Sequence, residues 1–313
     1  MVSDKLKTII NLLRIRQYYK NVLVFLALFF SELLLDFSLY PKIILGFIVL
    51  CCASSINYII NDIKDIEKDR AHAEKEKKKP LASGELSASF AIILILILSG
   101  TIVISVLFLI QDILFILTIL LLIITGQLYN LLLKNYPFVD LIALSFGYIW
   151  RTLAGCVLIG FLISPWLFLA IFEVAMFLVI AKRRGDLFYL GKDKASEHKQ
   201  VYNQYSQELL VQLHNMMATA LFITYSLYLI NKFNLNLFGT GTVNIYEYIV
   251  ILSIPFALYI IMRFIYLTSA KPEIARHAEK IFFDKGILIA GAITFFILLY
   301  AFYFDNIIAF LYP

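Results

Sequence analysis

The chain has 313 residues, of which 61% are hydrophobic and 16% are charged, and its formal net charge is +5. Soluble domains are roughly 45–50% apolar and about 25% charged, so this composition excludes an ordinary soluble protein and predicts a membrane protein. The three cysteines all lie in apolar stretches, which excludes a disulfide framework and a zinc-finger pattern.

Long apolar runs predict nine membrane-spanning helices. Each run is close to the roughly 20 residues that an α-helix needs to cross a bilayer. The runs are continuous rather than alternating in polarity, which favours helices over the strands of a barrel. The sequence therefore predicts an all-α polytopic membrane protein with a single domain, residues 1–313. In chain order the runs lie near residues 21–36, 41–60, 87–110, 112–133, 138–160, 165–181, 211–231, 246–268 and 286–311, and the first is the shortest.

With nine spans, the basic residues gather on one side of the membrane. Only Lys42 and Lys232 fall in the opposite loops, and Arg151 and Arg263 fall within spans. Cytosolic loops carry an excess of Lys and Arg, so the N-terminus is predicted to be cytosolic. We expect a multi-pass protein of the inner (cell) membrane whose active site faces the cytosol. We expect no nucleic-acid partner, and the sequence leaves a homo-oligomer open. The cytosolic loops are residues 61–86, 133–138, 182–210 and 270–285.

The sharpest local motif is NDIKDIEKD at residues 61–69, directly after the second span. If that helix continues, Asn61, Asp62, Asp65 and Asp69 lie on one stripe. Carboxylates on one stripe repel each other unless a cation joins them. Hard oxygen ligands suit Mg²⁺, which recruits substrate phosphates for its remaining positions. We predict that these four residues bind Mg²⁺ and that the three aspartates are catalytic. A solvated acidic helix end is the alternative, and the adjoining apolar span disfavours it.

Polar residues near the cytosolic ends of several spans are candidate substrate contacts. Bases beside a Mg²⁺ site fit a diphosphate or a phosphorylated sugar, whereas ordinary cytosolic positive charge is the alternative for each. Arg151 lies well inside the fifth span, so we expect it to face the bundle interior or a watery cavity, with Asp140 and Glu173 as candidate partners. A purely structural ion pair is the alternative. The predicted substrate-binding residues are Arg14, Gln17, Lys20, Asn21, Arg70, Lys75, Lys79, Tyr129, Asn130, Lys134, Arg151, Lys182, Arg183 and Asp186.

Together these motifs resemble the UbiA superfamily of intramembrane prenyltransferases. Residues 61–69 match its first Asp-rich motif, N-D-x-x-D-x-x-x-D, and the nine spans match its fold. A closer resemblance is to the decaprenyl-phosphate phosphoribosyltransferase family. It is carried by R-x-R-Q-x-x-K-N from Arg14, P-L-A-S-G from Pro80, Y-N-x-x-L-K from Tyr129 and A-K-R-x-G-D-L from Ala181. The resemblance extends from about Arg14 to Lys285.

The resemblance implies Mg²⁺-dependent transfer of 5-phosphoribose from phosphoribosyl diphosphate (PRPP) to a polyprenyl phosphate, with release of diphosphate, as a step toward cell wall biosynthesis. Three features depart from these patterns. The loop after the sixth span carries Lys182 and Arg183 where the quinone-forming branch of the superfamily has a second Asp-rich motif. Ala73 stands where the phosphoribosyltransferase pattern has Pro, and residues 75–79 are rich in Lys where that pattern is richer in Arg.

Two other functions stay open at this point. In the first, a prenyl group moves from a polyprenyl diphosphate to an aromatic acceptor, and a second carboxylate pair after the sixth span would favour it. In the second, the chain is a cation transporter, which would have inverted repeats with broken helices at mid-membrane, and the sequence contains no convincing repeat.

Overall fold

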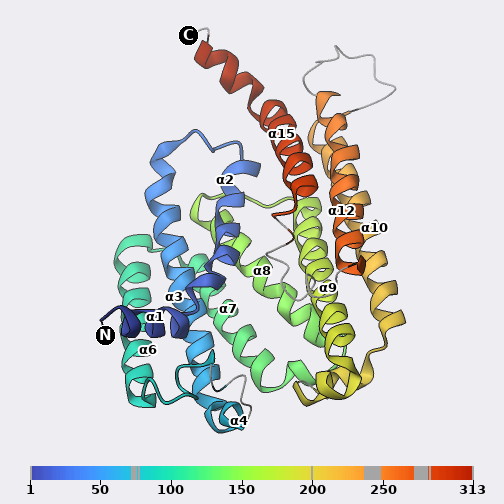
Figure 1. The fold of residues 1–313 in the computed structure, drawn as a ribbon. Helices are drawn as coiled ribbons and strands as arrows, with labels where there is room; N and C mark the ends of the chain where they lie inside the picture. The colour runs from blue at the N-terminus through green and yellow to red at the C-terminus, as the bar shows by residue number, and fades with distance from the viewer. Residues whose placement is uncertain are drawn as a thin grey trace. The chain divides into compact units, whose positions relative to one another are not determined.

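The computed structural model describes residues 2–71, 76, 78–198, 200–235, 248–270, 281 and 283–311. These residues form helices joined by turns, and no strand occurs among them (Figure 1). The chain divides into two compact units. Unit 1 comprises Met1–Leu133 and Phe146–Leu162, and unit 2 comprises Lys134–Ser145 and Ile163–Pro313.

Unit 1 is organised around the long helix α3, which contacts α1, η1, α6 and α7. Its apolar core includes Ile43 and Leu50 of α3, Phe115 of α7 and Ala154 of α8. Helix α1 runs across α3 and α6 rather than along them (Figure 1), and its buried Leu12 packs with Ile59 of α3. The elements are α1 (Val2–Leu13), the 3-10 helix η1 (Ile15–Phe25), α2 (Leu26–Phe30), η2 (Phe37–Leu39), α3 (Tyr40–Lys64), α4 (Ile66–Arg70), α6 (Ala88–Ile104), the π-helix η3 (Ser105–Ile110), α7 (Ile113–Leu131) and the later part of α8 (Val139–Leu158).

Unit 2 contains the first residues of α8 and the helices that follow it. Helices α9, α10 and α12 share an apolar core in which Phe177 of α9 packs against Phe264 of α12. Helix α9 is interrupted at Gly191, whose φ of 72° and ψ of 164° are not helical. The elements are η4 (Leu133–Asn135), α9 (Pro165–His198), η5 (Gln200–Gln204), α10 (Gln207–Lys232), η6 (Val250–Leu252), α12 (Ser253–Ala270) and α15 (Lys285–Leu311).

Polar side chains fix where several long helices begin. The Ser87 hydroxyl accepts the Phe90 N–H at the start of α6, and the Asp112 carboxylate accepts two backbone N–H groups at the start of α7. The Ser206 hydroxyl accepts the Leu209 N–H at the start of α10. Each N-cap satisfies backbone donors that have no partner within the helix, and this stabilises the helix start at that residue.

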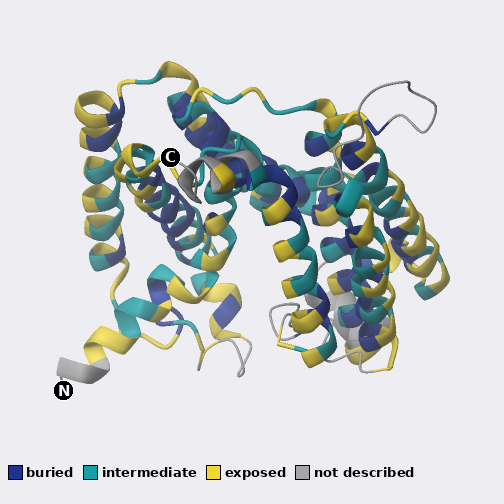
Figure 2. Cartoon of the chain, turned by 90° about the horizontal axis from the view of Figure 1, so that it is seen from above, coloured by how far each residue is buried: buried dark blue, intermediate teal, exposed yellow. Residues whose placement is uncertain are grey.

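Eight helices among the described residues are long and apolar enough to cross a membrane. They correspond to the second to ninth predicted spans. Their surfaces keep many large apolar side chains exposed, such as Leu96 and Phe108, as a lipid-facing surface requires. Figure 2 shows exposed and buried residues on different sides of the same helices. The eight segments are Phe37–Lys64, Ala88–Ile110, Ile113–Leu131, Val139–Leu158, Pro165–Tyr189, Gln207–Lys232, Val250–Ala270 and Lys285–Phe304.

The first predicted span, residues 21–36, is built differently from the prediction. Its first residues belong to the 3-10 helix η1, which begins earlier, and they continue into the five-residue helix α2. Helix α2 ends before Glu32, whose φ of 64° is left-handed, and Asp36 then caps η2. A nine-helix count is therefore not confirmed by the described residues.

Helix η1 nevertheless runs antiparallel to α3, as its contacts show. Residues that come later in η1 meet residues that come earlier in α3. The pairs are Arg14 with Asp62, Tyr18 with Ser55, Asn21 with Cys51, and Phe25 with Phe47. Fifteen residues of α-helix rise about 22 Å, and eleven residues of 3-10 helix also rise about 22 Å, so the two paths match in length.

A glycine permits the close contact between η1 and α8. A Cβ atom at Gly155 of α8 would lie 2.0 Å from the carbonyl oxygen of Val24 and 2.9 Å from its carbonyl carbon. These are backbone atoms, so they cannot move aside as a flexible side chain would. By contrast, a Cβ atom at Gly100 of α6 would meet nothing within 4 Å.

We predict that Gly155→Ala lowers the thermal stability of the purified protein, because overpacking typically costs about 1–3 kcal/mol. Gly100→Ala is the matched control, and it should leave the unfolding temperature unchanged or raise it slightly, since Ala favours helix. Thermal unfolding in detergent measures both. Equal unfolding temperatures for the two variants would contradict the close contact.

Candidate functional site

Two buried carboxylates converge at the end of α3. The side chains of Asp62 and Asp69 are each 4% exposed. Helix α3 ends at Lys64 and α4 begins at Ile66, but the Asp65 N–H still donates to the Asn61 carbonyl and the Asp69 N–H to the Asp65 carbonyl. The chain therefore keeps nearly the helical path, and two of the four residues predicted to share one stripe, Asp62 and Asp69, are brought together.

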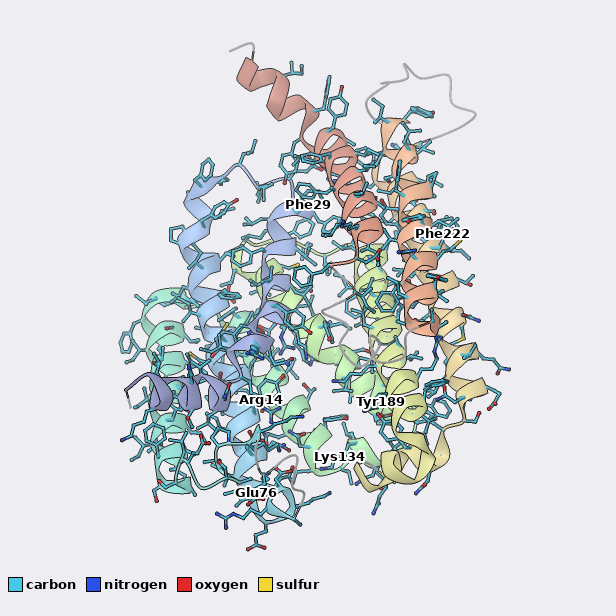
Figure 3. The ribbon with its side chains drawn as sticks, viewed as in Figure 1. Arg14, Phe29, Glu76, Lys134, Tyr189 and Phe222 are labelled. Atoms are coloured by element: carbon cyan, nitrogen blue, oxygen red, sulfur yellow. The ribbon has the colours of Figure 1, made fainter. Side chains whose placement is uncertain are left out.

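Two basic side chains neutralise this pair. The Lys79 ammonium lies 2.9 Å from Asp62 Oδ1 and 2.5 Å from Asp69 Oδ2. The Arg14 guanidinium donates to the same Oδ1 of Asp62 at 2.7 Å, and its centre lies 4.6 Å from the centroid of the Tyr58 ring. Arg14 lies where α1 ends (Figure 3), and its φ of 53° turns the chain into η1. Opposite charges at this spacing stabilise carboxylates that would otherwise be costly to bury.

The turn after α4 fixes the backbone of Lys79. The Ser83 N–H donates to the Lys79 carbonyl at 3.0 Å, and Gly84 takes the left-handed φ of 79° that closes the turn. Leu81 and Ala82 are buried, and the Arg70 guanidinium donates to the Ala82 carbonyl at 3.2 Å. The P-L-A-S-G sequence therefore acts as an anchor that places Lys79 beside the carboxylates.

The remaining predicted residues of unit 1 lie in several environments. The described ion pairs of this cluster involve Asp62 and Asp69 but not Asp65. Among the described residues, no group of three or more His, Cys, Asp or Glu side chains is arranged to hold a metal ion. Lys75 lies outside the described residues. Asn61, Asp65, Gln17, Lys20 and Asn130 are partly exposed, Arg70 is exposed, and Tyr129 is buried.

The donor set at the carboxylate pair suits a divalent cation. Two buried carboxylates already bring oxygen atoms to within 2.9 Å of one cationic group. Mg²⁺ is usually bound through one or two protein carboxylates, with water and substrate phosphates filling the other positions. Asp62 and Asp69 therefore fit the protein's share of such a site.

Arg151 is buried in unit 1 among neutral oxygens. Its guanidinium donates to Asn21 Oδ1 at 2.6 Å, to Ser54 Oγ at 3.1 Å and to the Gly147 carbonyl. Asn21 is itself fully buried. The arginine thus links α8 to η1 and α3, and Asn21 orients it.

Asp140 and Glu173, the candidate partners of Arg151, are wrong. Asp140 instead pairs with Arg183, with 2.9 Å between the guanidinium and a carboxylate oxygen, and Glu173 accepts a hydrogen bond from Thr224. Carbonyl, amide and hydroxyl oxygens take the place of a carboxylate around Arg151. Asn21 and Ser54 are distant from Arg151 in sequence and uncharged, which is why the pattern of charges did not predict them.

A buried polar network in unit 2 contains two of the predicted substrate-binding residues. Arg183 donates to both Asp140 and the Tyr202 hydroxyl. The Tyr205 hydroxyl donates to Asp140 at 2.7 Å, and the Tyr202 hydroxyl donates to Asp186 at 2.9 Å. Burial raises the pKa of both tyrosines, so both remain donors at neutral pH. The network fastens the segment after α9 to the start of α8.

The basic cluster after the sixth span is divided among three environments. Lys182 is exposed, whereas Arg183 is buried in the network just described. Arg184 is also buried, and it reaches Ser269 at 2.7 Å and Nδ1 of His214 at 3.2 Å. Lys134, in η4, is partly exposed. Sequence reasoning missed the two tyrosines and His214, although the three-residue spacing of Tyr202 and Tyr205 in a polar stretch was a usable signal.

Comparison with known families decides to which family this chain belongs. The profile of the UbiA prenyltransferase family matches residues 22–286. The chain belongs to this family. The UbiA chain is therefore an enzyme of the transferase class, and its apolar helices make it a multi-pass membrane protein.

Two relatives and one solved structure show which UbiA proteins this chain is similar to. It is 33% identical over 183 residues to an uncharacterized protein, y4nM, of Sinorhizobium fredii, and the match covers 58% of this chain and 34% of that relative, about a third of its length. It is 25% identical over 284 residues to a decaprenyl-phosphate phosphoribosyltransferase of Mycolicibacterium smegmatis, covering 90% and 87% of the two chains. A UbiA homolog from Archaeoglobus fulgidus, solved bound to DMAPP and Mg²⁺, shares the fold with a TM-score of 0.65, 16% identity and coverage of 94% and 97%.

We predict that Asp140→Asn destabilises the protein by about 3–5 kcal/mol, because it removes the buried carboxylate charge that pairs with Arg183 at 2.9 Å. Asp284→Asn is the matched control. Asp284 pairs with Arg263 near the surface, with side-chain exposures of 19% and 34%, and solvent screens that pair. Thermal unfolding should show a large loss for the first variant and a small one for the second. Similar losses would contradict a structural role for the buried pair.

Proposed function

We propose that this UbiA enzyme transfers 5-phosphoribose from PRPP to a polyprenyl phosphate, with Mg²⁺ as cofactor and diphosphate as the released product. One structural observation supports the proposal above the others: Asp62 and Asp69 hold a single cationic group between them at the end of a membrane helix, with Arg14 beside them. Relatives from Mycolicibacterium smegmatis and Corynebacterium glutamicum are named decaprenyl-phosphate phosphoribosyltransferase, which supports phosphoribosyl transfer to a polyprenyl phosphate.

In this proposal the PRPP diphosphate binds at the carboxylate pair. Asp62 and Asp69, with Asn61 and Asp65, would hold Mg²⁺, which when bound neutralises charge on the departing diphosphate. Lys79, and with it Arg14, Arg70 and Lys75, would donate charge-assisted hydrogen bonds to phosphate oxygens.

The chemical step needs no strong base. The bond between ribose C1 and the diphosphate oxygen breaks, and a lipid phosphate oxygen forms the new bond to C1. A phosphate monoester is already anionic near neutral pH, since its second pKa is about 6. The protein therefore acts mainly by positioning both phosphates and by stabilising charge.

Other side chains are assigned to the lipid phosphate or to alignment. Exposed Lys182, together with Lys134, is proposed to contact the lipid phosphate. Arg183 and Asp186, which lie in the buried network, are proposed to act by positioning the segment that carries Lys182. In unit 1 the proposed substrate contacts are Gln17, Lys20, Asn21, Tyr129, Asn130 and Arg151.

The same proposal includes nine membrane crossings with a cytosolic N-terminus in the inner membrane. Segment 15–30 would make the first crossing, because it follows α3 in the opposite direction over matched length. The carboxylate pair would then lie at the cytosolic ends of the helices, where basic loops are expected.

We predict that purified protein with labelled PRPP, polyprenyl phosphate and Mg²⁺ produces a labelled lipid. EDTA should abolish the reaction, and added Mg²⁺ should restore it, because the metal neutralises the leaving group. Thin-layer chromatography of the extracted lipid measures the product. If no label enters the lipid, and the protein instead prenylates an aromatic acid from polyprenyl diphosphate, the proposed phosphoribosyl transfer is wrong.

We predict that Asp69→Asn lowers kcat by about 100-fold or more, because the Mg²⁺ that would neutralise the leaving diphosphate loses a carboxylate ligand. Glu67→Gln is the matched control: it removes a carboxylate from the same short helix, but its side chain is exposed. That variant should retain near wild-type turnover. Normal turnover in Asp69→Asn, with folding verified by gel filtration, would exclude the assigned role of Asp69.

A further inference from the structure

Among the residues that the structure describes, two basic side chains offset the two charges of the carboxylate pair. Asp62 and Asp69 contribute two negative charges, and Arg14 and Lys79 contribute two positive charges within 2.9 Å of their oxygens. A divalent cation added to this balanced group would meet the Lys79 ammonium at the place where the two carboxylates converge. Like charges at such separations repel strongly in a partly buried site.

The Lys79 ammonium can change position while the backbone of Lys79 stays fixed. Its backbone is anchored by the buried Leu81 and Ala82 and by the hydrogen bond from Ser83. Its side chain keeps 21% exposure, whereas the two carboxylates are almost fully buried. A lysine has a flexible four-carbon stem, so its ammonium can turn away while its Cα stays fixed.

We propose that Lys79 is an internal stand-in for the metal ion, which makes metal binding depend on diphosphate. In the substrate-free protein the ammonium occupies the position between Asp62 and Asp69 and excludes a divalent cation. When diphosphate arrives, its oxygens offer the ammonium a new partner, and the metal takes the vacated position. This inference rests on the proposed function for the assignment of the metal and diphosphate to this site.

The mechanism has a signature that a merely structural lysine lacks. Removing the ammonium strengthens binding of the metal alone, because a competing cation is lost. The same change weakens binding of the metal–diphosphate complex, because a phosphate contact is lost. A lysine that only maintained the fold would weaken both when removed.

The test compares wild type with Lys79→Met in detergent, using Mn²⁺ as the probe for the divalent site. Electron paramagnetic resonance measures binding of Mn²⁺ alone, and equilibrium dialysis of labelled pyrophosphate with excess Mn²⁺ measures the complex. We expect Lys79→Met to bind Mn²⁺ alone at least about tenfold more tightly, since a unit charge a few ångströms from a divalent ion opposes binding. We expect its affinity for pyrophosphate to fall at least about tenfold.

Four further variants make the outcome specific. Lys68→Met removes an exposed charge from α4 and should behave as wild type. Lys79→Arg keeps the charge and should keep weak Mn²⁺ binding. Lys79→Gln should bind Mn²⁺ more tightly than wild type, and it serves if the Met variant does not fold. Adding Asp69→Asn to Lys79→Met should remove the increase in Mn²⁺ affinity, which would show that the additional Mn²⁺ binding occurs at the carboxylate pair.

Unchanged or weaker Mn²⁺ binding by both folded Lys79 variants without the charge would overturn the inference. If Mn²⁺ binding is unchanged or weaker but wild type transfers phosphoribose normally, the proposed function is retained and only the inference about Lys79 is wrong. If the two opposite effects are seen but no label enters the lipid, Lys79 is the stand-in as inferred, and the proposed substrate pair is wrong.

Discussion

The burial of two carboxylates at the end of a membrane-spanning helix constrains everything around them. Asp62 and Asp69 must each meet a cation, because a buried charge without a partner costs several kcal/mol or more. Two turns with a left-handed backbone conformation bring the cations to the carboxylates. One turn is at Arg14, and the other is at Gly84, five residues after Lys79. Helix α1, the turn after α4 and the start of η1 are therefore placed by electrostatics as much as by apolar packing.

Much of the fold and part of the site follow from sequence because they depend on local periodicity. Eight apolar runs became helices, since a continuous run of about 20 residues has no other stable form in lipid. The seven-residue spacing of Asp62 and Asp69 placed them on one face for the same reason. Segment 21–36 escaped prediction because hydropathy starts it at Asn21, after the polar Arg16 and Lys20, whereas η1 begins at Ile15. No simple pattern separates a 3-10 helix from an α-helix here.

Contacts between distant residues were harder to predict. Lys182 and Arg183 were both predicted to bind substrate. The structure instead gives Lys182, Arg183 and the next residue, Arg184, three different surroundings, because successive residues of a helix are rotated by about 100°. Arg151 was expected to find a carboxylate and found neutral oxygens instead. A run of charge indicates which side of the membrane a loop occupies, but it does not indicate which charges remain available to a ligand.

The three-residue period of η1 restricts how this part of the chain can evolve. Tyr18, Asn21 and Val24 form a single column, in which the first two bond to α3 and the third lies against Gly155. Inserting or deleting one residue would rotate the later members by about 120° and shift them by about 2 Å, so those contacts would be lost together. Residues 15–25 can therefore change one at a time by substitution. Insertions and deletions in homologous chains are expected in the turn at residues 31–36, where they do not change the positions of Tyr18, Asn21 and Val24 relative to α3 and α8.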